Sequence, residues 1–133
     1  MTDTLPPPET FSDRLLGASI PARDTRLRLV RLDRTLGEIL AAHDYPPPIR
    51  HLLAEALVIG ALVGGLIDEA EGQMTMQAQT TAGVVKLLVC DYRAGAIRGY
   101  VDFDGDRLAE LGANATLEAL FGSGFLAITF DVP

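Results

Sequence analysis

Two histidines and one cysteine are the side chains best suited to nucleophilic or acid–base chemistry in this chain of 133 residues. His43 is followed by Asp44 and Tyr45, which could form an acid–base cluster, and either His43 or His51 could activate the Cys90 thiol. No further motif supports either arrangement. Polar groups at a helix boundary commonly bond the free helix-terminal backbone. We therefore interpret the HDY run as a structural elbow and expect no enzyme activity.

Cys90 is the only cysteine of the chain, and it alternates into a predicted strand. In such a position a cysteine usually packs as a small buried hydrophobe. A single cysteine forms no intrachain disulfide and cannot assemble a cluster of metal-binding thiolates. This cysteine usage fits a reducing, cytoplasmic setting.

Acidic and glycine-containing turns are the remaining candidates for ligand sites. Asp104 and Asp106, or the acidic residues Asp68, Glu69 and Glu71, could hold a cation, but neither group has calcium-loop spacing. Turn formation explains them better. Three late glycines do not form a phosphate-binding loop, because no lysine follows in the required place: Gly112, Gly122 and Gly124. We expect no metal and no cofactor in this chain.

Composition excludes several classes of partner. The formal net charge of −7 argues against binding to nucleic acid or to anionic lipid, both of which need a basic face. The N-terminus has neither the basic start nor the apolar run of a signal peptide. The uncharged run at residues 56–67 is shorter than the ~20 residues that span a bilayer. Because 48% of the residues are hydrophobic, we expect one folded domain with a real core.

The chain is organised around residues 43–68, which enter through the prolines Pro46 to Pro48 and continue as a long apolar helix. Surface helices have one apolar stripe, whereas residues 56–67 carry no charge on any side. We therefore expect this helix to be buried all round at the centre of the core. Gly60 and Gly64 weaken a helix, and we expect them to allow close approach of another backbone.

The segments before the helix follow from local signals. Residues 1–9 carry three prolines and predict a flexible tail, and residues 10–16 predict a short helix that stops at Gly17. Alternation in residues 24–32 indicates a strand. Thr35 and Glu38 form a capping box that begins a helix through Ala42. We place the tail and short helix in residues 1–22 and the domain itself in residues 23–133.

After the helix the pattern changes to alternation, which indicates strands. Residues 73–103 predict an antiparallel meander, residues 108–111 and 116–121 short helices, and residues 124–132 a last strand close to the end of the chain. Such an edge tends to seek pairing. The overall prediction is an α+β fold, a mostly antiparallel sheet packed around a long buried central helix. Met74 and Met76 lie on one strand face; they are candidates for binding apolar partners, although core packing is the more ordinary role.

Residues 35–66 resemble the N-terminal domain of the redox-regulated 33-kilodalton heat-shock chaperone family, the disulfide-bond chaperonins. The resemblance rests on the elbow His43-Asp44-Tyr45-Pro46, on Leu53-Ala54-Glu55 before the apolar helix, and on later matches that fall in the right order. These later matches are Gly72-Gln73, residues 77–83, Ile97-Arg98-Gly99-Tyr100 and Gly122-Ser123-Gly124-Phe125.

The resemblance implies an ATP-independent holdase that binds unfolded client proteins under oxidative and heat stress. It implies an α/β domain with sheets around a central helix. Separately, we expect a homo-oligomer, a dimer. Family members also carry a C-terminal zinc module with CxC and CxxC thiolates as a redox switch. None of those cysteines occurs here, so the chain resembles a truncated family member that is incomplete at its C-terminal end. The alternative is a structural or dimerisation module with no activity of its own, and a patch left uncovered predicts self-association.

Overall fold

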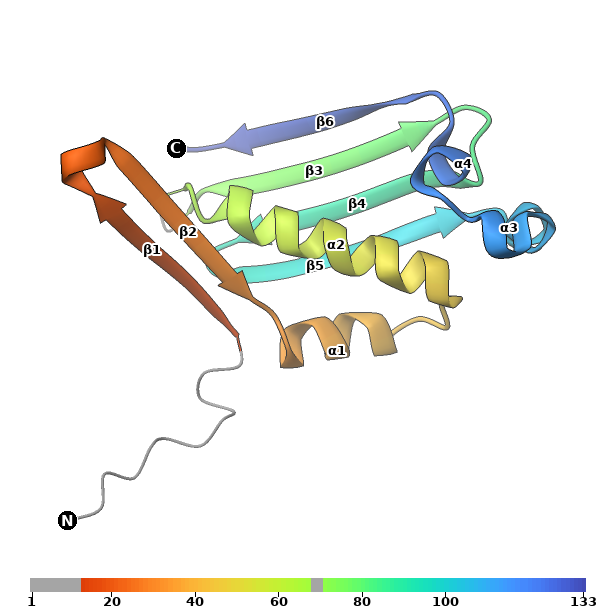
Figure 1. The fold of residues 1–133 in the computed structure, drawn as a ribbon, viewed down its shortest axis with the longest axis horizontal. Coiled ribbons are helices and arrows are strands. Elements are labelled where there is room, and N and C mark those ends of the chain that lie inside the picture. The colour runs from red at the N-terminus through yellow and green to blue at the C-terminus, as the bar shows by residue number, and fades with distance from the viewer. Residues whose placement is uncertain (1–12, 68–70) are drawn as a thin grey trace, which may run out of the picture.

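A four-stranded antiparallel sheet with one long helix across its inner face forms the body of the protein (Figure 1). The computed structural model describes residues 13–67 and 71–133. The sheet has the order β5-β4-β3-β6. Its strands are β3 (Gln73–Thr80), β4 (Val85–Arg93), β5 (Ala96–Phe103) and β6 (Gly124–Asp131). This arrangement confirms the α+β class, the meander of residues 73–103 and the last strand.

Strand β3 has the alternation expected of a strand with one buried face. Met74, Met76 and Ala78 are buried, and the residues between them are less so. β3 pairs with β4 through Met76 opposite Cys90, and with β6 through Met76 opposite Ile128. Since residues directly opposite share a face, Met76, Cys90 and Ile128 all lie on the inner face of the sheet, toward the long helix.

Helix α2 (Pro47–Gly64) is the central helix, and it begins directly after Pro46. The stripe of residues buried against the sheet follows the predicted helical spacing: Ile49, Leu52, Leu53, Ala56, Leu57, Gly60, Ala61 and Gly64. The expectation of burial all round was wrong, because Val58, Leu62 and Val63 are only partly buried and Ile59 is half exposed. The sheet covers only one side of α2.

Helix α2 is also long and apolar enough, by length and composition, to cross a membrane. The core helix of a water-soluble protein meets the same criteria. Its stripe of residues buried against the sheet, 44% of the helix, fits that second interpretation.

Helix α1 (Arg34–Ala41) has its N-cap two residues before the predicted cap Thr35, and the predicted capping box is wrong. Asp33 is the N-cap residue, and its side chain makes no capping hydrogen bond. Instead the Asp13 carboxylate accepts hydrogen bonds from the backbone N–H of Asp33 at 2.7 Å and of Thr35 at 3.2 Å. A carboxylate distant in sequence therefore satisfies the free N–H groups of the first turn.

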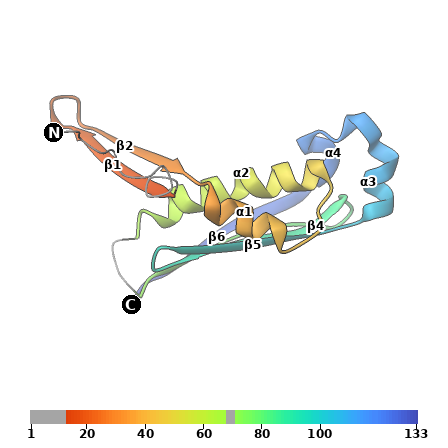
Figure 2. The ribbon, with the colours of Figure 1, turned by 90° about the horizontal axis from the view of Figure 1, so that it is seen from below.

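The β1–β2 hairpin precedes α1, with strands β1 (Arg14–Ile20) and β2 (Thr25–Arg31) joined by the 3₁₀ turn η2 (Pro21–Arg23). It projects past the end of α2, away from the sheet (Figure 2). The predicted strand at 24–32 is confirmed. The predicted short helix at 10–16 is wrong from Arg14 onward, because these residues pair with β2 through Arg14 opposite Arg31. The predicted tail at 1–9 lies outside the described residues.

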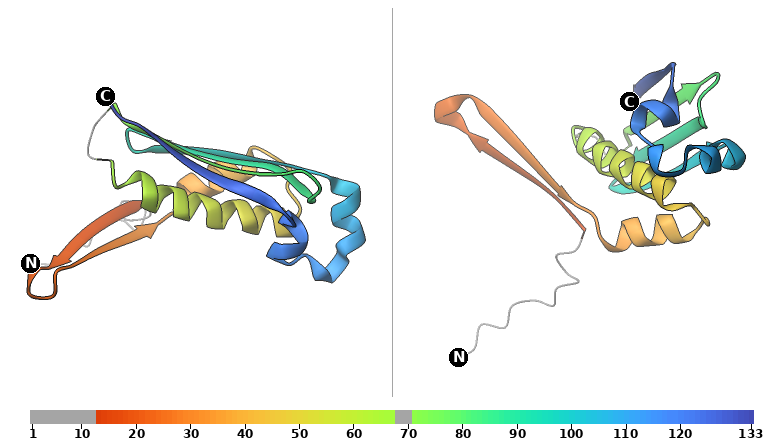
Figure 3. Two further views of the ribbon diagram at one scale, coloured as in Figure 1. Left: turned by 90° about the horizontal axis from the view of Figure 1, so that it is seen from above. Right: turned by 45° about the vertical axis from the view of Figure 1, so that its right-hand side comes forward.

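Two short helices lie between β5 and β6 at one end of the sheet (Figure 3). They are α3 (Gly105–Leu111) and α4 (Leu117–Phe121), with the 3₁₀ turn η3 (Gly112–Asn114) between them. Asp104 caps α3 by accepting from the N–H groups of Asp106 and Arg107, and Thr116 caps α4 by accepting from Ala119. Both predicted helical segments are confirmed. Together they return the chain to the far side of β3.

Candidate functional site

An open apolar groove of about 420 Å³ lies between α2, α4 and the β6 side of the sheet. We call it the β6 groove. Its lining is almost entirely hydrophobic, with Glu55 as the one ionisable side chain. The lining residues are Leu52, Glu55, Ala56, Ile59, Met76, Ala78, Gln79, Thr80, Leu88, Leu117, Phe121, Gly122, Gly124, Phe125, Leu126 and Ile128. Such a lining binds apolar groups.

The groove exists because α2 does not reach β6. Helix α2 packs mainly on β4 and β5. Strand β6 lies on the far side of β3 from β4, at the edge of the sheet. The inner-face residues of β6 are therefore left in solvent: Leu126 is 61% exposed and Ile128 42% exposed. Phe130 on the same face is also exposed. These residues form a strip of uncovered apolar surface.

The glycines of α2 explain where the helix sits. A Cβ on Gly60 would overlap the Cys90 Sγ, and a Cβ on Gly64 would overlap the Tyr92 ring. Both partners belong to β4, so the small residues let α2 settle directly on that strand. The predicted role in close approach is correct, but the neighbours are β4 side chains and not another backbone.

The structure buries both methionines that were candidates for binding apolar partners. Met74 has no exposed surface and Met76 is 4% exposed. Met76 forms part of the floor of the β6 groove, whereas Met74 does not line it. Client binding by these two residues stays a prediction. The sequence analysis did not single out Leu126 and Ile128, although alternation in the last strand marks them as one face.

The elbow lies between α1 and α2, and its three polar residues have different surroundings. Tyr45 is buried, and its hydroxyl accepts a hydrogen bond from the backbone N–H of Val101 at 3.1 Å. The His43 and Tyr45 rings lie 5.1 Å apart between centroids. His43 and Asp44 are exposed. The Tyr45 hydroxyl is thus bonded to strand β5. The expectation that the polar groups of the elbow bond helix-terminal backbone was therefore wrong for Tyr45.

Cys90 is fully buried on β4 beneath Gly60. Burial, with a smaller contribution from the neighbouring Asp91 carboxylate, raises the pKa of its thiol to about 12. A thiol nucleophile needs access and a depressed pKa. Cys90 therefore lacks both properties, and neither His43 nor His51 is hydrogen-bonded to it.

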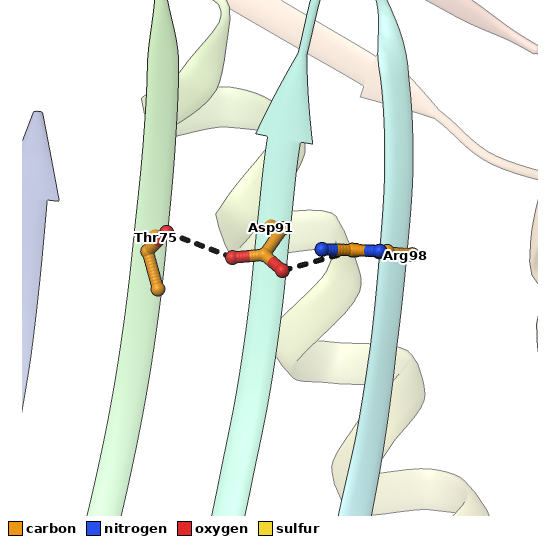
Figure 4. Close-up of polar contacts among 3 residues, drawn as sticks. All are labelled: Thr75, Asp91 and Arg98. Atoms are coloured by element: carbon orange, nitrogen blue, oxygen red, sulfur yellow. Dashed lines mark hydrogen bonds and ion pairs between the residues drawn. The ribbon is translucent and has the colours of Figure 1, made fainter. Parts of the chain in front are cut away.

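The outer face of the sheet carries a polar ladder across three strands (Figure 4). Asp91 on β4 accepts from the Thr75 hydroxyl at 2.8 Å and from the Arg98 Nε at 3.0 Å. The side chain of Asp91 is largely buried by these neighbours, while that of Arg98 is exposed. The ladder connects β3, β4 and β5 and contributes to the stability of the sheet.

No group of three or more metal-ligating side chains occurs within residues 13–67 and 71–133. Asp104 caps α3, which accounts for the Asp104 and Asp106 pair. Of the second acidic group, Asp68 and Glu69 lie outside the described residues.

A second uncovered surface, which the sequence analysis missed, lies on the β1–β2 hairpin. We call it the hairpin apolar face, and all its residues are exposed: Leu16, Ala18, Ile20, Leu27 and Leu29. The opposite face of the hairpin is turned to the body, where Leu15 contacts Gly65 and the Arg28 Nη1 donates to the Gly65 carbonyl at 2.8 Å. The strand pairing decides which of the leucines share a face.

The family model and the curated relatives that match this chain all point to the same family. The model of the family described as Hsp33 protein matches residues 13–133. The 33 kDa chaperonin of Caulobacter vibrioides (strain NA1000 / CB15N) is 36% identical over 135 residues, which cover 98% of this chain and 44% of the relative. The 33 kDa chaperonin of Pseudomonas fluorescens (strain SBW25) is 34% identical over 131 residues, 98% of this chain and 41% of the relative. The chain thus spans about two fifths of the length of these curated relatives.

Proposed function

The chain belongs to the Hsp33 protein family, and from this premise we propose that it is an ATP-independent chaperone domain, a holdase, that binds unfolded proteins at the β6 groove. The relatives are named 33 kDa chaperonins, which supports a chaperone role for the family. We extend that role to this chain and assign client binding to the β6 groove. It includes a cytoplasmic setting and no enzymatic reaction.

The observation that carries the proposal is the uncovered inner face of β6 beside an apolar groove. Leu126 and Ile128 are exposed, yet they lie on the face that is core elsewhere in the sheet. Unfolded proteins expose apolar side chains, and burying them releases about 25 cal/mol per Å². Binding of this kind is driven by burial alone and requires no nucleotide.

We also propose that this chain binds clients without a thiol switch of its own. Cys90 is its one cysteine and is buried with a raised pKa, so oxidants in solution have no exposed thiolate to react with here. The zinc module that the family resemblance implies has no ligands in this chain. Holdase activity of the chain should therefore be equal in oxidising and reducing buffer.

The test is aggregation of thermally unfolding citrate synthase, followed by light scattering without ATP. We expect the protein to suppress scattering, and the double variant Leu126→Ser/Ile128→Ser to lose most of this effect. Ala127→Ser is the matched control, because Ala127 lies on the opposite face of the same strand, opposite Gln77. If a folded wild-type sample suppresses nothing, the holdase proposal fails. If the control variant loses activity equally, the β6 groove is not the binding surface.

The hairpin apolar face favours a second candidate function, a structural or dimerisation module. An isolated two-stranded hairpin is marginally stable, and this one exposes five apolar side chains on one face. Five of the eleven basic residues lie in residues 13–32, with only two of the eighteen acidic residues. The cationic hairpin and the acidic remainder of the chain are complementary in charge, which favours contact between two copies.

Sedimentation velocity over a wide concentration range tests this candidate. We expect self-association that Leu27→Ser/Leu29→Ser weakens, while the matched control Ser19→Ala, on the opposite face of the hairpin, leaves it unchanged. A wild-type protein that stays monomeric at every concentration would refute the dimerisation module and leave the holdase proposal standing.

A further inference from the structure

Glu55 stands where two hollows of the surface meet. The first is the β6 groove, and the second is a hollow of about 380 Å³ between α2 and the segment formed by η3 and α4. Both are lined by Leu52, Glu55 and Leu117. Figure 3 shows α4 beside the half of α2 that begins at Pro47, where Leu52 and Glu55 lie. Because they share these three residues, the two hollows adjoin, and Glu55 lies at their boundary.

The lining of the two hollows carries one acidic group and neither lysine nor arginine. Its second ionisable side chain is His51, whose Nε2 lies 3.3 Å from the Glu55 Oε1. Among the described residues Glu55 has no other ion pair or side-chain hydrogen bond. Both side chains are exposed, at 80% for His51 and 63% for Glu55. Such an exposed pair contributes little to stability, so the Glu55 carboxylate is accessible to a ligand.

Neither capping nor the helix dipole accounts for a glutamate at this position. Glu55 lies in the middle of α2, whereas the dipole acts on charges within the first and last turns. It is the last charged residue before the uncharged run at residues 56–67. Next to it, Ala56 is buried, and Ile59 one turn further lines the β6 groove. The fold thus holds a single carboxylate at an apolar surface, the arrangement by which binding sites gain specificity.

The chemistry of the two hollows determines which segment fits across their boundary. Along an extended chain every second side chain points the same way, so residues i, i+2 and i+4 face one surface over about 13 Å. A segment lying across the boundary, on the face of the sheet that carries α2, directs residue i into one hollow and residue i+4 into the other. Residue i+2 then lies at Glu55. A basic side chain there is attracted to the carboxylate and an acidic one is repelled.

From this arrangement we propose that Glu55 is the specificity-determining residue of the client site, which selects extended segments that carry a lysine or arginine between two large apolar residues. The apolar groups supply most of the affinity, and Glu55 discriminates by charge. Acidic segments are rejected, since an unpaired carboxylate beside Glu55 loses hydration and gains repulsion. The inference rests on the proposed holdase function and names its client class.

Fluorescence anisotropy with labelled synthetic peptides tests the charge preference. The parent peptide has phenylalanine at positions i and i+4, lysine at i+2 and serine elsewhere. Two derivatives replace the lysine by Nε-acetyl-lysine, which keeps the chain and removes the charge, or by glutamate. We expect the protein to bind the parent about three- to tenfold more tightly than the acetylated peptide, and the glutamate peptide more weakly still. High salt should reduce this preference.

Substitutions at Glu55 isolate its contribution. Glu55→Gln should bind the lysine and acetylated peptides equally, and Glu55→Lys should prefer the glutamate peptide. Glu38→Gln is the matched control, because it removes the same charge from an exposed position on α1 outside both linings. It should keep the wild-type preference. Leu126→Ser/Ile128→Ser should weaken all three peptides by a similar factor, since these residues supply apolar contact alone. Circular dichroism confirms that each variant is folded.

A lysine preference that Glu55→Gln keeps, or that Glu38→Gln loses to the same extent, overturns the inference. Equal binding of the three peptides by the wild-type protein does so too, as does a lack of binding to the lysine peptide. Suppression of citrate synthase aggregation that depends on Leu126 and Ile128 would then still stand, as client binding without charge selection. Absence of that suppression is what refutes the holdase itself, so the two failures are distinguishable.

Discussion

Gly60 of α2 lies against the Sγ of Cys90 on β4 so closely that there is no room for a Cβ. The contact fixes the position of the central helix over β4, and through it the distance between α2 and β6. Two features follow from this one contact. Cys90 is sealed from solvent, and the inner face of β6 stays uncovered.

Gly60→Ala should therefore destabilise the protein. Overpacking a filled site costs about 1–3 kcal/mol, which should exceed the gain of about 1 kcal/mol in helix propensity. In a Cys90→Ala background the same change should cost much less, because the obstructing Sγ is gone and the remaining neighbours lie 3.5 Å or more away. Urea unfolding of the four proteins measures this coupling as a double-mutant cycle.

Gly37→Ala on α1 is the control for that cycle. A Cβ at Gly37 would meet nothing within 4 Å, so the change should stabilise the protein by up to about 1 kcal/mol. Additive effects of Gly60→Ala and Cys90→Ala would show that the contact does not limit the position of α2.

Tyr45→Phe should cost about 1–3 kcal/mol of unfolding free energy. The hydroxyl is the acceptor for the Val101 N–H in a buried position, and a buried donor left unpaired loses the interaction without regaining water. Tyr100→Phe serves as the comparison. Tyr100 is exposed on β5, next to Val101, and its substitution should change the free energy of unfolding little. Chemical denaturation with an unchanged m-value measures both. Equal stability of Tyr45→Phe and wild type would indicate that water replaces the hydroxyl.

The Asp13 cap should make stability depend on pH. The hydrogen bond from the Asp33 N–H is the main cause that lowers the pKa of the Asp13 carboxyl, and the Thr35 N–H lowers it further. A depressed folded-state pKa means that the stabilisation is complete above the unfolded value of about 3.9 and is lost as the pH falls through the folded value. The stability difference between wild type and Asp13→Asn should thus be largest near neutral pH.

The same difference should shrink as the pH falls below about 4. Thermal unfolding of both proteins across the acid range measures it. A difference that is constant with pH would mean that the carboxylate charge contributes nothing to capping α1.

Cys90 should resist alkylation in the native protein. With its pKa raised to about 12, almost none of the thiol is ionised near neutral pH, and its burial blocks the reagent. Iodoacetamide labelling followed by mass spectrometry should be slow in buffer and rapid in denaturant. Rapid labelling of the folded protein would contradict the burial of Cys90 and would restore the thiol-nucleophile hypothesis.

The elements whose own residues carry a complete pattern were predicted well. The alternation of Met74, Met76 and Ala78 with polar residues specifies a strand and its buried face. Helix α2 was recognised from its spacing and from the prolines before it. The resemblance to the chaperone family rested on the elbow, and the Hsp33 match over residues 13–133 confirms it.

Elements that depend on a distant partner were predicted poorly. Residues 14–16 were expected to be helical, but they form a strand because they pair with residues 29–31. The capping box at Thr35 had the right residue types, yet the Asp13 carboxylate accepts from the Thr35 N–H, the group to which Glu38 would have bonded.

For α2 and for the strands of the four-stranded sheet, the sequence by itself determined which residues form the element and which side is apolar, because side-chain period is a property of the local backbone. It did not determine β1, whose strand depends on pairing with β2. Nor did it determine how much of each apolar side other elements would cover. That depends on where α2 packs on the sheet, and the packing of Gly60 on Cys90 sets this position only in the folded protein. Hence the apolar residues of β6 became an open groove, while those of β3 became core.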